Sequence, residues 1–577
     1  RRRRSRGALR MQTTRFSDLA YQRPDLAQLE ASFRSLTEAF RQARTADGAI
    51  EAMRAVTALR NHTDTMATLV SIRHSLDTRD AFYDTENNFM DEAMPHIEGY
   101  LNDFFRALDE TPFKEAISGV YGNHLFELIA VKLKTFRPEI VEDLQTENKL
   151  GSEYTKLLSG ARIPFEGEER NLSQMGPFTQ SKDRDMRRRA QKAVTAFFVE
   201  NESEFDRIYD ELVKIRTVIA KKLGFATFTP LAYARFNRTD YDETMVAAYR
   251  DQVYRSVVPV TQKLRERQAK RLGLPALKYY DESLEFPSGN AKPQGSPEWM
   301  IAHAKAMYGE MSPETGEFFD FMLDGGLMDL VTKPGKAPGG YCTYIPDARA
   351  PFIFSNFNGT SDDVDVLTHE AGHAFQVYQS RHHELPEYAW PTLEACEIHS
   401  MSMEFLAWPW MERFFEHETA KYRFAHLSGA LLFIPYGVTV DEFQHWVYAN
   451  PQATPAERKA QWRAIERKYL PHRDYEDNDF LERGGFWFRQ GHIFGSPFYY
   501  IDYTLAQVSA FEFWAKSRQD RTSTWADYLA LCKAGGSRSY LNLLPIARLR
   551  NPFTEGSIAA IMEPVSAWLD TVDDTNM

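Results

Sequence analysis

The sequence predicts a mainly α-helical protein with a small β-sheet beside one of its helices. Apolar residues recur every three or four positions over most of the chain, which is the spacing of one helix face. Between residues 333 and 361 this period gives way to short β-prone runs separated by Gly, Pro and Asp. The chain has 577 residues, 43% hydrophobic and 13% aromatic, so it carries enough apolar surface for a sizeable core.

The helical pattern begins at Leu26 and continues to about Gln145. Residues 29–43 and 50–76 are both amphipathic, and the short turn between them predicts a helical hairpin followed by further helices. A second helical block is expected from Lys182 to Lys222, where the basic run is a solvated face. Residues 283–298 contain three Pro and two Gly, and we expect a surface loop there.

Charge and cysteine content exclude several classes of protein. The net charge is −12, and without the six Arg of residues 1–10 it is −18, which disfavours nucleic acid as a partner. We interpret residues 1–10 as a disordered leader or upstream segment. The three cysteines are too few and too scattered for a disulfide framework, which indicates a reducing cytoplasm. No run of about 18 apolar residues exists, so no membrane span is expected. Pro435 limits the most apolar stretch, residues 427–438, to a buried helix end.

Two short strands are predicted just before the next helix. They are YCTYI at 341–345 and FIFSNF at 352–357, with turn residues on either side. An extended peptide can add itself to the edge of such a pair through backbone hydrogen bonds. The other interpretation is an ordinary structural hairpin.

The helix expected at 362–380 carries the pattern H-E-x-x-H, as His369, Glu370 and His373. Residues four apart lie on one helix face, so both imidazoles can bind one zinc ion at about 2.0–2.1 Å. Glu370 can then reach a water at the fourth position and accept its proton, which is the equipment for hydrolysing an amide. Ser361 is the expected N-cap, and Gly372 allows another element to pack closely. The alternative is a buried helix with two hydrogen-bonded histidines.

The third ligand defines the class of zinc site. A metzincin needs Gly at 376 and His at 379, and both positions are Gln. A second helical run at 392–408 offers Glu394 and Glu397, and spacing alone does not choose between them. His382 and His383 are rivals, although they fall on the expected loop after the first helix.

These motifs resemble the thimet oligopeptidase and oligoendopeptidase F family of zinc metallopeptidases, most closely its bacterial oligoendopeptidase F branch. The resemblance rests on HEAGHAFQ at 369–376 and EIHSMSME at 397–404, and also on RFNRTDYD at 235–242, AGGSRSYLNLL at 534–544 and GHIFGSPFYYIDY at 491–503. It implies a large, two-lobed, clam-like helical peptidase whose deep cleft is lined near the zinc helix by the small sheet. It also implies one Zn2+ per chain, with Glu397 as third ligand opening an E-x-x-S-x-x-x-E pattern that includes Ser400 and Glu404.

The same resemblance implies that His492 and at least one nearby tyrosine donate hydrogen bonds to the oxyanion of the tetrahedral intermediate. The candidates are Tyr499, Tyr500 and Tyr503, and we favour Tyr500 and Tyr503, which share a face if the run is helical. Without the resemblance, an aromatic run with one His is more often protein core. The expected organisation is an N-terminal helical region at 11–165 and a catalytic region at 166–577. Short unstructured peptides are the expected substrates, and a monomer or small homo-oligomer the expected state.

Two other functions fit parts of the pattern. A helical metallocarboxypeptidase also uses H-E-x-x-H with a downstream Glu, but it needs a basic group that grips the substrate's terminal carboxylate. A non-catalytic peptide-binding protein with a structural zinc needs four protein ligands, often Cys, and leaves Glu370 without a purpose.

Overall fold

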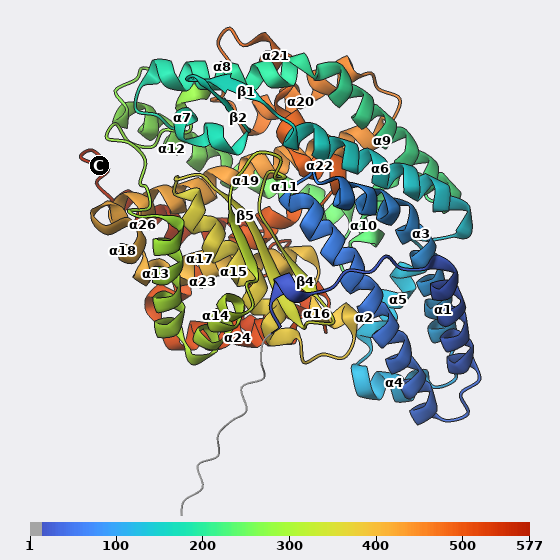
Figure 1. Ribbon diagram of the computed structural model, residues 1–577. Coiled ribbons are helices and arrows are strands. Elements are labelled where there is room, and N and C mark those ends of the chain that lie inside the picture. Colours follow the sequence, from blue (N-terminus) through green and yellow to red (C-terminus); the bar gives the residue numbers. More distant parts are fainter. Residues whose placement is uncertain (1–13) are drawn as a thin grey trace, which may run out of the picture.

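The computed structural model describes residues 14–577 and shows a mainly helical protein with two small sheets in that part of the chain (Figure 1). Residues 1–10, interpreted above as a leader or upstream segment, lie outside the described residues. The first helical region is confirmed, and three of its helices start at a side-chain cap: Asp25, Thr45 and Asp80 accept backbone N–H bonds. Its helices are α1 (Leu26–Arg41), α2 (Ala46–Leu76), α3 (Ala81–Asp109), α4 (Lys114–Tyr121), α5 (His124–Lys132) and α6 (Val141–Ser159).

Helices α1 to α5 gather on one side of the molecule and enclose a hydrophobic core of their own (Figure 1). Phe33, Phe40 and Phe104 are almost fully buried there. This core is completed by two residues from far along the chain, Leu385 and Tyr388. The N-terminal helices therefore pack against the segment that follows residue 380, not only against each other.

The middle of the chain adds further helices and a two-stranded sheet. The predicted second helical block is confirmed as α8 (Arg184–Glu200) and α9 (Glu202–Lys222). Residues 283–296 form the predicted loop, but Leu284, Phe286 and Ala291 are buried, so the loop is anchored in the core and is not simply a surface segment. The remaining elements here are β1 (Ile163–Phe165), β2 (Glu168–Arg170), α7 (Gly176–Thr179), α10 (Phe228–Arg235), α11 (Glu243–Ser256), α12 (Val258–Arg271), α13 (Pro297–Met311) and α14 (Pro313–Asp324).

The predicted strand pair is present as β4 (Tyr341–Ile345) and β5 (Ala350–Phe357), antiparallel with Cys342 opposite Ile353. A third strand, β3 (Met328–Val331), was not predicted; it pairs with β5 in parallel and gives the order β3-β5-β4. Strand β5 is central and nearly all buried, whereas β4 is an edge. Strand β4 therefore has a strand neighbour on one side only.

The sheet lies directly beside α15 (Asp362–Ser380), at the centre of the molecule (Figure 1). Ser361 occupies the predicted N-cap position, but its side chain makes no bond to the helix backbone. Asp363 instead accepts the backbone N–H groups of Asn358 and Gly359 at 2.9 and 2.8 Å and so fixes the turn before α15. Helix α15 packs on α17 (Leu393–Leu406), which packs on α23 (Ile501–Gln519).

Helices continue to the C-terminus as predicted, but Pro435 does not end one. It lies inside α19 (Thr419–Ala449). An 18-residue window of the helical stretch Glu412–Ala449, with mean hydropathy 1.2, is long and apolar enough for a membrane span, yet 61% of that window is buried within the protein, as in a core helix. The remaining helices are α16 (Pro386–Ala389), α18 (Glu412–Phe415), α20 (Pro455–Tyr469), α21 (Asp479–Glu482), α22 (Gly491–Gly495), α24 (Arg521–Ala534), α25 (Tyr540–Leu543) and α26 (Ser557–Thr571).

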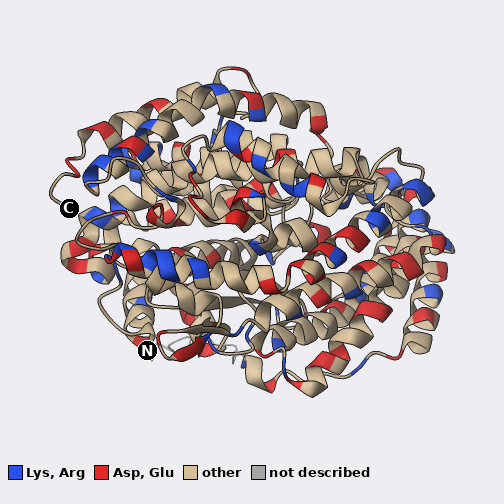
Figure 2. Ribbon diagram, turned by 90° about the horizontal axis from the view of Figure 1, so that it is seen from above, with Lys and Arg blue, Asp and Glu red and all other residues tan. Residues whose placement is uncertain are grey.

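Lys and Arg are interspersed with Asp and Glu along the helices in the view of Figure 2. Many are paired across elements, for example Lys459 with Asp206 at 2.7 Å.

Candidate active site

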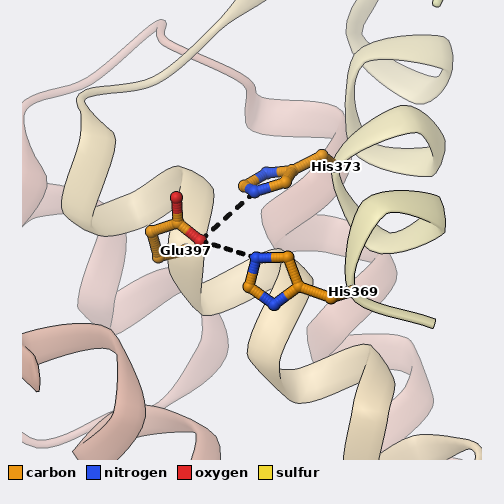
Figure 3. A group of neighbouring side chains, drawn as sticks. All are labelled: His369, His373 and Glu397. Atoms are coloured by element: carbon orange, nitrogen blue, oxygen red, sulfur yellow. Dashed lines mark ion pairs between the residues drawn. The ribbon is translucent and has the colours of Figure 1, made fainter. Parts of the chain in front are cut away.

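Two helices bring three side chains that could hold a metal ion to one point. His369 and His373 lie one turn apart on α15, and both direct Nε2 at the same carboxylate oxygen of Glu397 on α17, at 3.1 and 3.2 Å (Figure 3). The Glu397 side chain is 1% exposed. Burial alone raises the pKa of Glu397, but the charges of His373 and His369 hold it well below its ordinary value. The carboxylate is therefore ionised, as a metal ligand must be.

The rivals for the third position lie elsewhere. Glu394 is turned into a separate buried network, where Tyr241 donates to it at 2.9 Å and Thr392 also donates. His382 contacts the backbone oxygen of Gln379, and His383 contacts that of Lys533. Of the candidates, the structure brings only Glu397 to the two histidines.

Gly372 lets α15 and α17 approach closely enough for this meeting. A Cβ atom at that position would lie 2.7 Å from the Ser400 Cα and 2.8 Å from the His399 carbonyl oxygen. The expected close packing is therefore confirmed. Ser400 Oγ donates to Glu397 Oε2 at 2.8 Å, so the E-x-x-S spacing holds the third carboxylate in place from one turn below.

A further hydrogen-bond chain orients His369. Its Nδ1 is 3.0 Å from Glu404 Oε2, and His426 Nε2 is 3.0 Å from the other oxygen of Glu404. The Trp408 indole donates to His426 Nδ1 at 2.7 Å. Because an indole N–H can only donate, His426 carries its proton on Nε2 and gives it to Glu404. Glu404 is thus left to accept the Nδ1–H of His369, which directs Nε2 toward His373 and Glu397.

The proton on His426 Nε2 also determines whether the cluster of Asp365, Glu404 and His426 can bind a metal ion. These three residues lie close enough together to resemble a second metal site. The protonated Nε2 of His426 has no lone pair to offer a cation. The arrangement is a hydrogen-bonded support for His369.

Glu370 lies between the two histidines in sequence and faces the same cavity. It is 6% exposed, and its Oε2 has no hydrogen-bond partner among the described residues. Burial raises the pKa of Glu370 above its ordinary value. A buried carboxylate oxygen without a partner is costly in a folded protein, so it marks a position that a substrate or water completes.

The aromatic run brings its polar groups to this point from α22 and the start of α23. His492 Nε2 is 2.8 Å from Tyr503 Oη, and Tyr499 Oη donates to Glu397 Oε1. Tyr499 and Tyr503 line the cavity of about 340 Å³ that contains His369, His373 and Glu397. Tyr500 does not; it lines a neighbouring cavity of about 490 Å³ with His492 and Tyr503. Burial lowers the pKa of His492 to about 4, so the imidazole is neutral at pH 7.

Two cysteines, Cys342 and Cys396, also line the cavity that contains His369, His373 and Glu397. The sequence did not predict their presence there. Burial raises the pKa of both thiols well above the ordinary value. Neither sulfur lies within 4.8 Å of all three ligand atoms of the His369, His373 and Glu397 group. They are packing residues of the cavity wall and not a fourth ligand.

The donor set fits zinc. Tetrahedral zinc with bonds of about 2.0–2.1 Å holds its ligand atoms roughly 3.3 Å apart, and the two N–O separations here are 3.1 and 3.2 Å. Two imidazoles and one carboxylate are also the ligand set of catalytic zinc sites that leave one position open. A helical fold with this site, an adjacent buried carboxylate and an edge strand defines the class of helical metallopeptidases.

The comparisons place the chain within that class. Residues 16–136 match the Peptidase M3 N-terminal domain, and residues 316–563 match peptidase family M3. A structure of PZ peptidase A with an inhibitor is 57% identical, covers 97% of this chain and 100% of its own, and superposes with a TM-score of 0.97. An oligoendopeptidase F from Bacillus anthracis is 53% identical, with 98% and 99% coverage and a TM-score of 0.93.

Another oligoendopeptidase F structure is 58% identical, with 98% and 100% coverage and a TM-score of 0.97. The comparison with curated proteins gave no match. The chain belongs to peptidase family M3, in its oligoendopeptidase F branch, and is a metalloendopeptidase that hydrolyses oligopeptides. The predicted family and the mainly α fold are therefore confirmed.

Proposed function

We propose that the protein uses one zinc ion per chain, held by His369, His373 and Glu397, to hydrolyse short unstructured peptides. The observation that carries this proposal is the convergence of two imidazole Nε2 atoms on one buried carboxylate oxygen at 3.1 and 3.2 Å. Zinc bound by three protein ligands supplies Lewis acidity toward a peptide carbonyl and lowers the pKa of a water to about 7. A structural zinc would close all four positions with protein ligands, and the described residues provide three.

Glu370 is proposed to accept the proton of the attacking water. Its carboxylate faces the cavity of the ligands and has one oxygen without a partner. The same carboxyl group can later return that proton to the leaving nitrogen, which needs it to depart as an amine. Its raised pKa brings the group closer to the pH at which both transfers are possible.

His492 and Tyr503 are proposed to stabilise the oxyanion that forms on the carbonyl. Their side chains contact each other at 2.8 Å, and Tyr503 lines the cavity of the metal ligands. A donor aimed at an atom that gains charge binds the transition state more strongly than the ground state, so it raises kcat.

The substrate backbone is proposed to lie along β4. This strand is the edge of the sheet, and its first two residues, Tyr341 and Cys342, line the cavity. Backbone pairing there is independent of the peptide's sequence and requires an extended, unfolded segment. No Lys or Arg lines this cavity among the described residues, which favours endopeptidase action over the carboxypeptidase alternative. Peptide turnover in a reducing cytoplasm, without nucleic acid or membrane partners and as a monomer or small homo-oligomer, remains part of this proposal.

Metal removal tests the proposal. The protein is dialysed against a chelator, its zinc is measured by mass spectrometry, and cleavage of an internally quenched peptide is followed before and after zinc is added back. We expect cleavage to disappear with the metal and to return at one zinc per chain. A stably folded protein at the same concentration is the control substrate and should remain intact. Full activity in the metal-free protein would refute the zinc dependence. Digestion of the folded control would refute the restriction to unstructured peptides.

A further inference from the structure

A chain of four side chains leads from α19 to the metal-site cavity. Tyr436 on α19 donates its hydroxyl hydrogen to Gln490 Oε1 at 2.8 Å. The amide nitrogen of Gln490 is 2.9 Å from His492 Nδ1, and His492 Nε2 is 2.8 Å from Tyr503 Oη. Neither Tyr436 nor Gln490 lines the cavity that contains the metal ligands.

With the Gln490 amide nitrogen facing His492, the chemistry of these groups fixes where each proton lies. A carboxamide nitrogen can only donate, so His492 Nδ1 must be the acceptor and carries no hydrogen. A neutral imidazole has one N–H, which therefore lies on Nε2. That N–H donates to the oxygen of Tyr503, because Nε2 then has no lone pair with which to accept. The Tyr503 hydroxyl hydrogen is consequently free to point away from His492.

The same reasoning separates Tyr503 from the other tyrosines. The Tyr499 hydrogen is engaged by Glu397 Oε1, so it is not available to a substrate. Tyr500 lines only the neighbouring cavity. Tyr503 lines both cavities, and the hydroxyl group beside it is that of Tyr499, whose own hydrogen is engaged by Glu397.

We propose that Gln490, oriented by Tyr436, is a positioning residue that selects the Nε2–H tautomer of His492 and thereby makes Tyr503 the hydrogen-bond donor to the oxyanion. His492 acts through Tyr503: its N–H polarises the phenol oxygen, and so strengthens the donor. With the opposite tautomer, Tyr503 would donate to His492 and present only lone pairs, which repel a developing negative charge. This inference rests on the proposed zinc peptidase function and goes beyond it in assigning the direction of each hydrogen bond.

Gln490→Glu tests the direction, because a carboxylate can only accept. It would draw a hydrogen onto His492 Nδ1, free Nε2 to accept, and turn the Tyr503 hydrogen away from the substrate. We expect kcat to fall by about 10²-fold, close to the loss in Tyr503→Phe, with KM changed far less. In Gln490→Glu combined with Tyr503→Phe, the second change should add almost no further loss, since both remove the same donor. Tyr436→Phe, which leaves the Gln490 amide in place but free to rotate, should lose less.

The readouts separate positioning from folding. Zinc content and melting temperature are measured for each variant, and Gln28→Glu on the exposed face of α1 is the matched control, expected to behave as wild type. Nitrogen-15 NMR of histidine-labelled protein should show His492 protonated at Nε2 in wild type and at Nδ1 in Gln490→Glu.

Wild-type kcat in Gln490→Glu, or an Nδ1–H tautomer in the wild type, would overturn the inference. Failure of the proposed function is recognised separately, because the wild type would then cleave peptides without zinc.

Discussion

Gly372→Ala should separate the two helices that carry the metal ligands. The added methyl group would lie 2.7 Å from the Ser400 Cα, 2.8 Å from the His399 carbonyl oxygen and 3.0 Å from the Met403 Cβ. Ordinary contact between carbon atoms is about 3.5–4.0 Å, so the shortest approach is too close by roughly 0.8 Å. Two of the three neighbours are backbone atoms of α17, which cannot rotate out of the way. The helices must therefore move apart.

The balance of two effects sets the size of the loss. Ala is favoured over Gly inside a helix by about 1 kcal/mol, whereas overpacking a core costs typically 1–3 kcal/mol, and rigid backbone neighbours favour the upper end. We expect a net loss of about 1–2 kcal/mol in the free energy of unfolding. Glu397 moves with α17 away from His369 and His373, so zinc should bind about 10–100-fold more weakly, as for other changes to the groups that orient ligands.

Urea unfolding, zinc titration and peptide cleavage measure the three consequences. The matched control is Gly119→Ala on α4, where the new methyl group meets no atom within 4 Å. This control should be neutral or stabilised by up to about 1 kcal/mol. If Gly372→Ala unfolds at the same urea concentration as wild type and keeps its zinc affinity, the close approach of α15 and α17 does not set the geometry of the site.

Three further substitutions test individual roles. Glu370→Gln keeps the shape of the site but cannot accept a proton, so zinc should be retained and turnover lost; measurable turnover near the wild-type rate would exclude Glu370 as the base. Glu397→Ala should lose zinc, measured by mass spectrometry, whereas Glu394→Ala should retain it; the reverse result would contradict the choice of third ligand. Tyr503→Phe should lower kcat by roughly 10²–10³-fold with little change in melting temperature, and unchanged kcat would show that its hydroxyl group does not act on the substrate.

The sequence predicted the parts of the site whose geometry is local. His369 and His373 meet because residues four apart always share a helix face, whatever surrounds the helix. The choice between Glu394 and Glu397, by contrast, could not be made from local geometry. Both lie on α17, three residues apart, and the rotation of that helix decides which one faces α15. The close approach of α17 at Gly372 contributes to that rotation, and the sequence pattern indicated a close approach there but neither the partner helix nor its orientation.

The tyrosines show the same limit. Tyr500 and Tyr503 were favoured because they share a face in a continuous helix, but α23 begins only at Ile501. Phe498 before it has φ of 73°, and its backbone N–H is held by Gln444 at 2.9 Å, so the chain turns sharply there. The turn places Tyr499 and Tyr503 in the metal-site cavity and Tyr500 beside it. Strand β3 was missed for a related reason, since its parallel partner lies more than twenty residues away.

The link between α15 and α17 has a mechanical consequence. This link contains α16, where Glu387 forms a buried ion pair with Arg60 of α2 at 2.7 Å. Tyr388 donates to the Tyr121 carbonyl oxygen at 2.7 Å and, with Leu385, completes the core of the N-terminal helices. The N-terminal helices therefore hold the segment that joins α15, which carries two of the proposed ligands, to α17, which carries the third. A displacement of those helices would pull on this segment, so the position of the N-terminal helices and the spacing of the metal ligands are mechanically coupled.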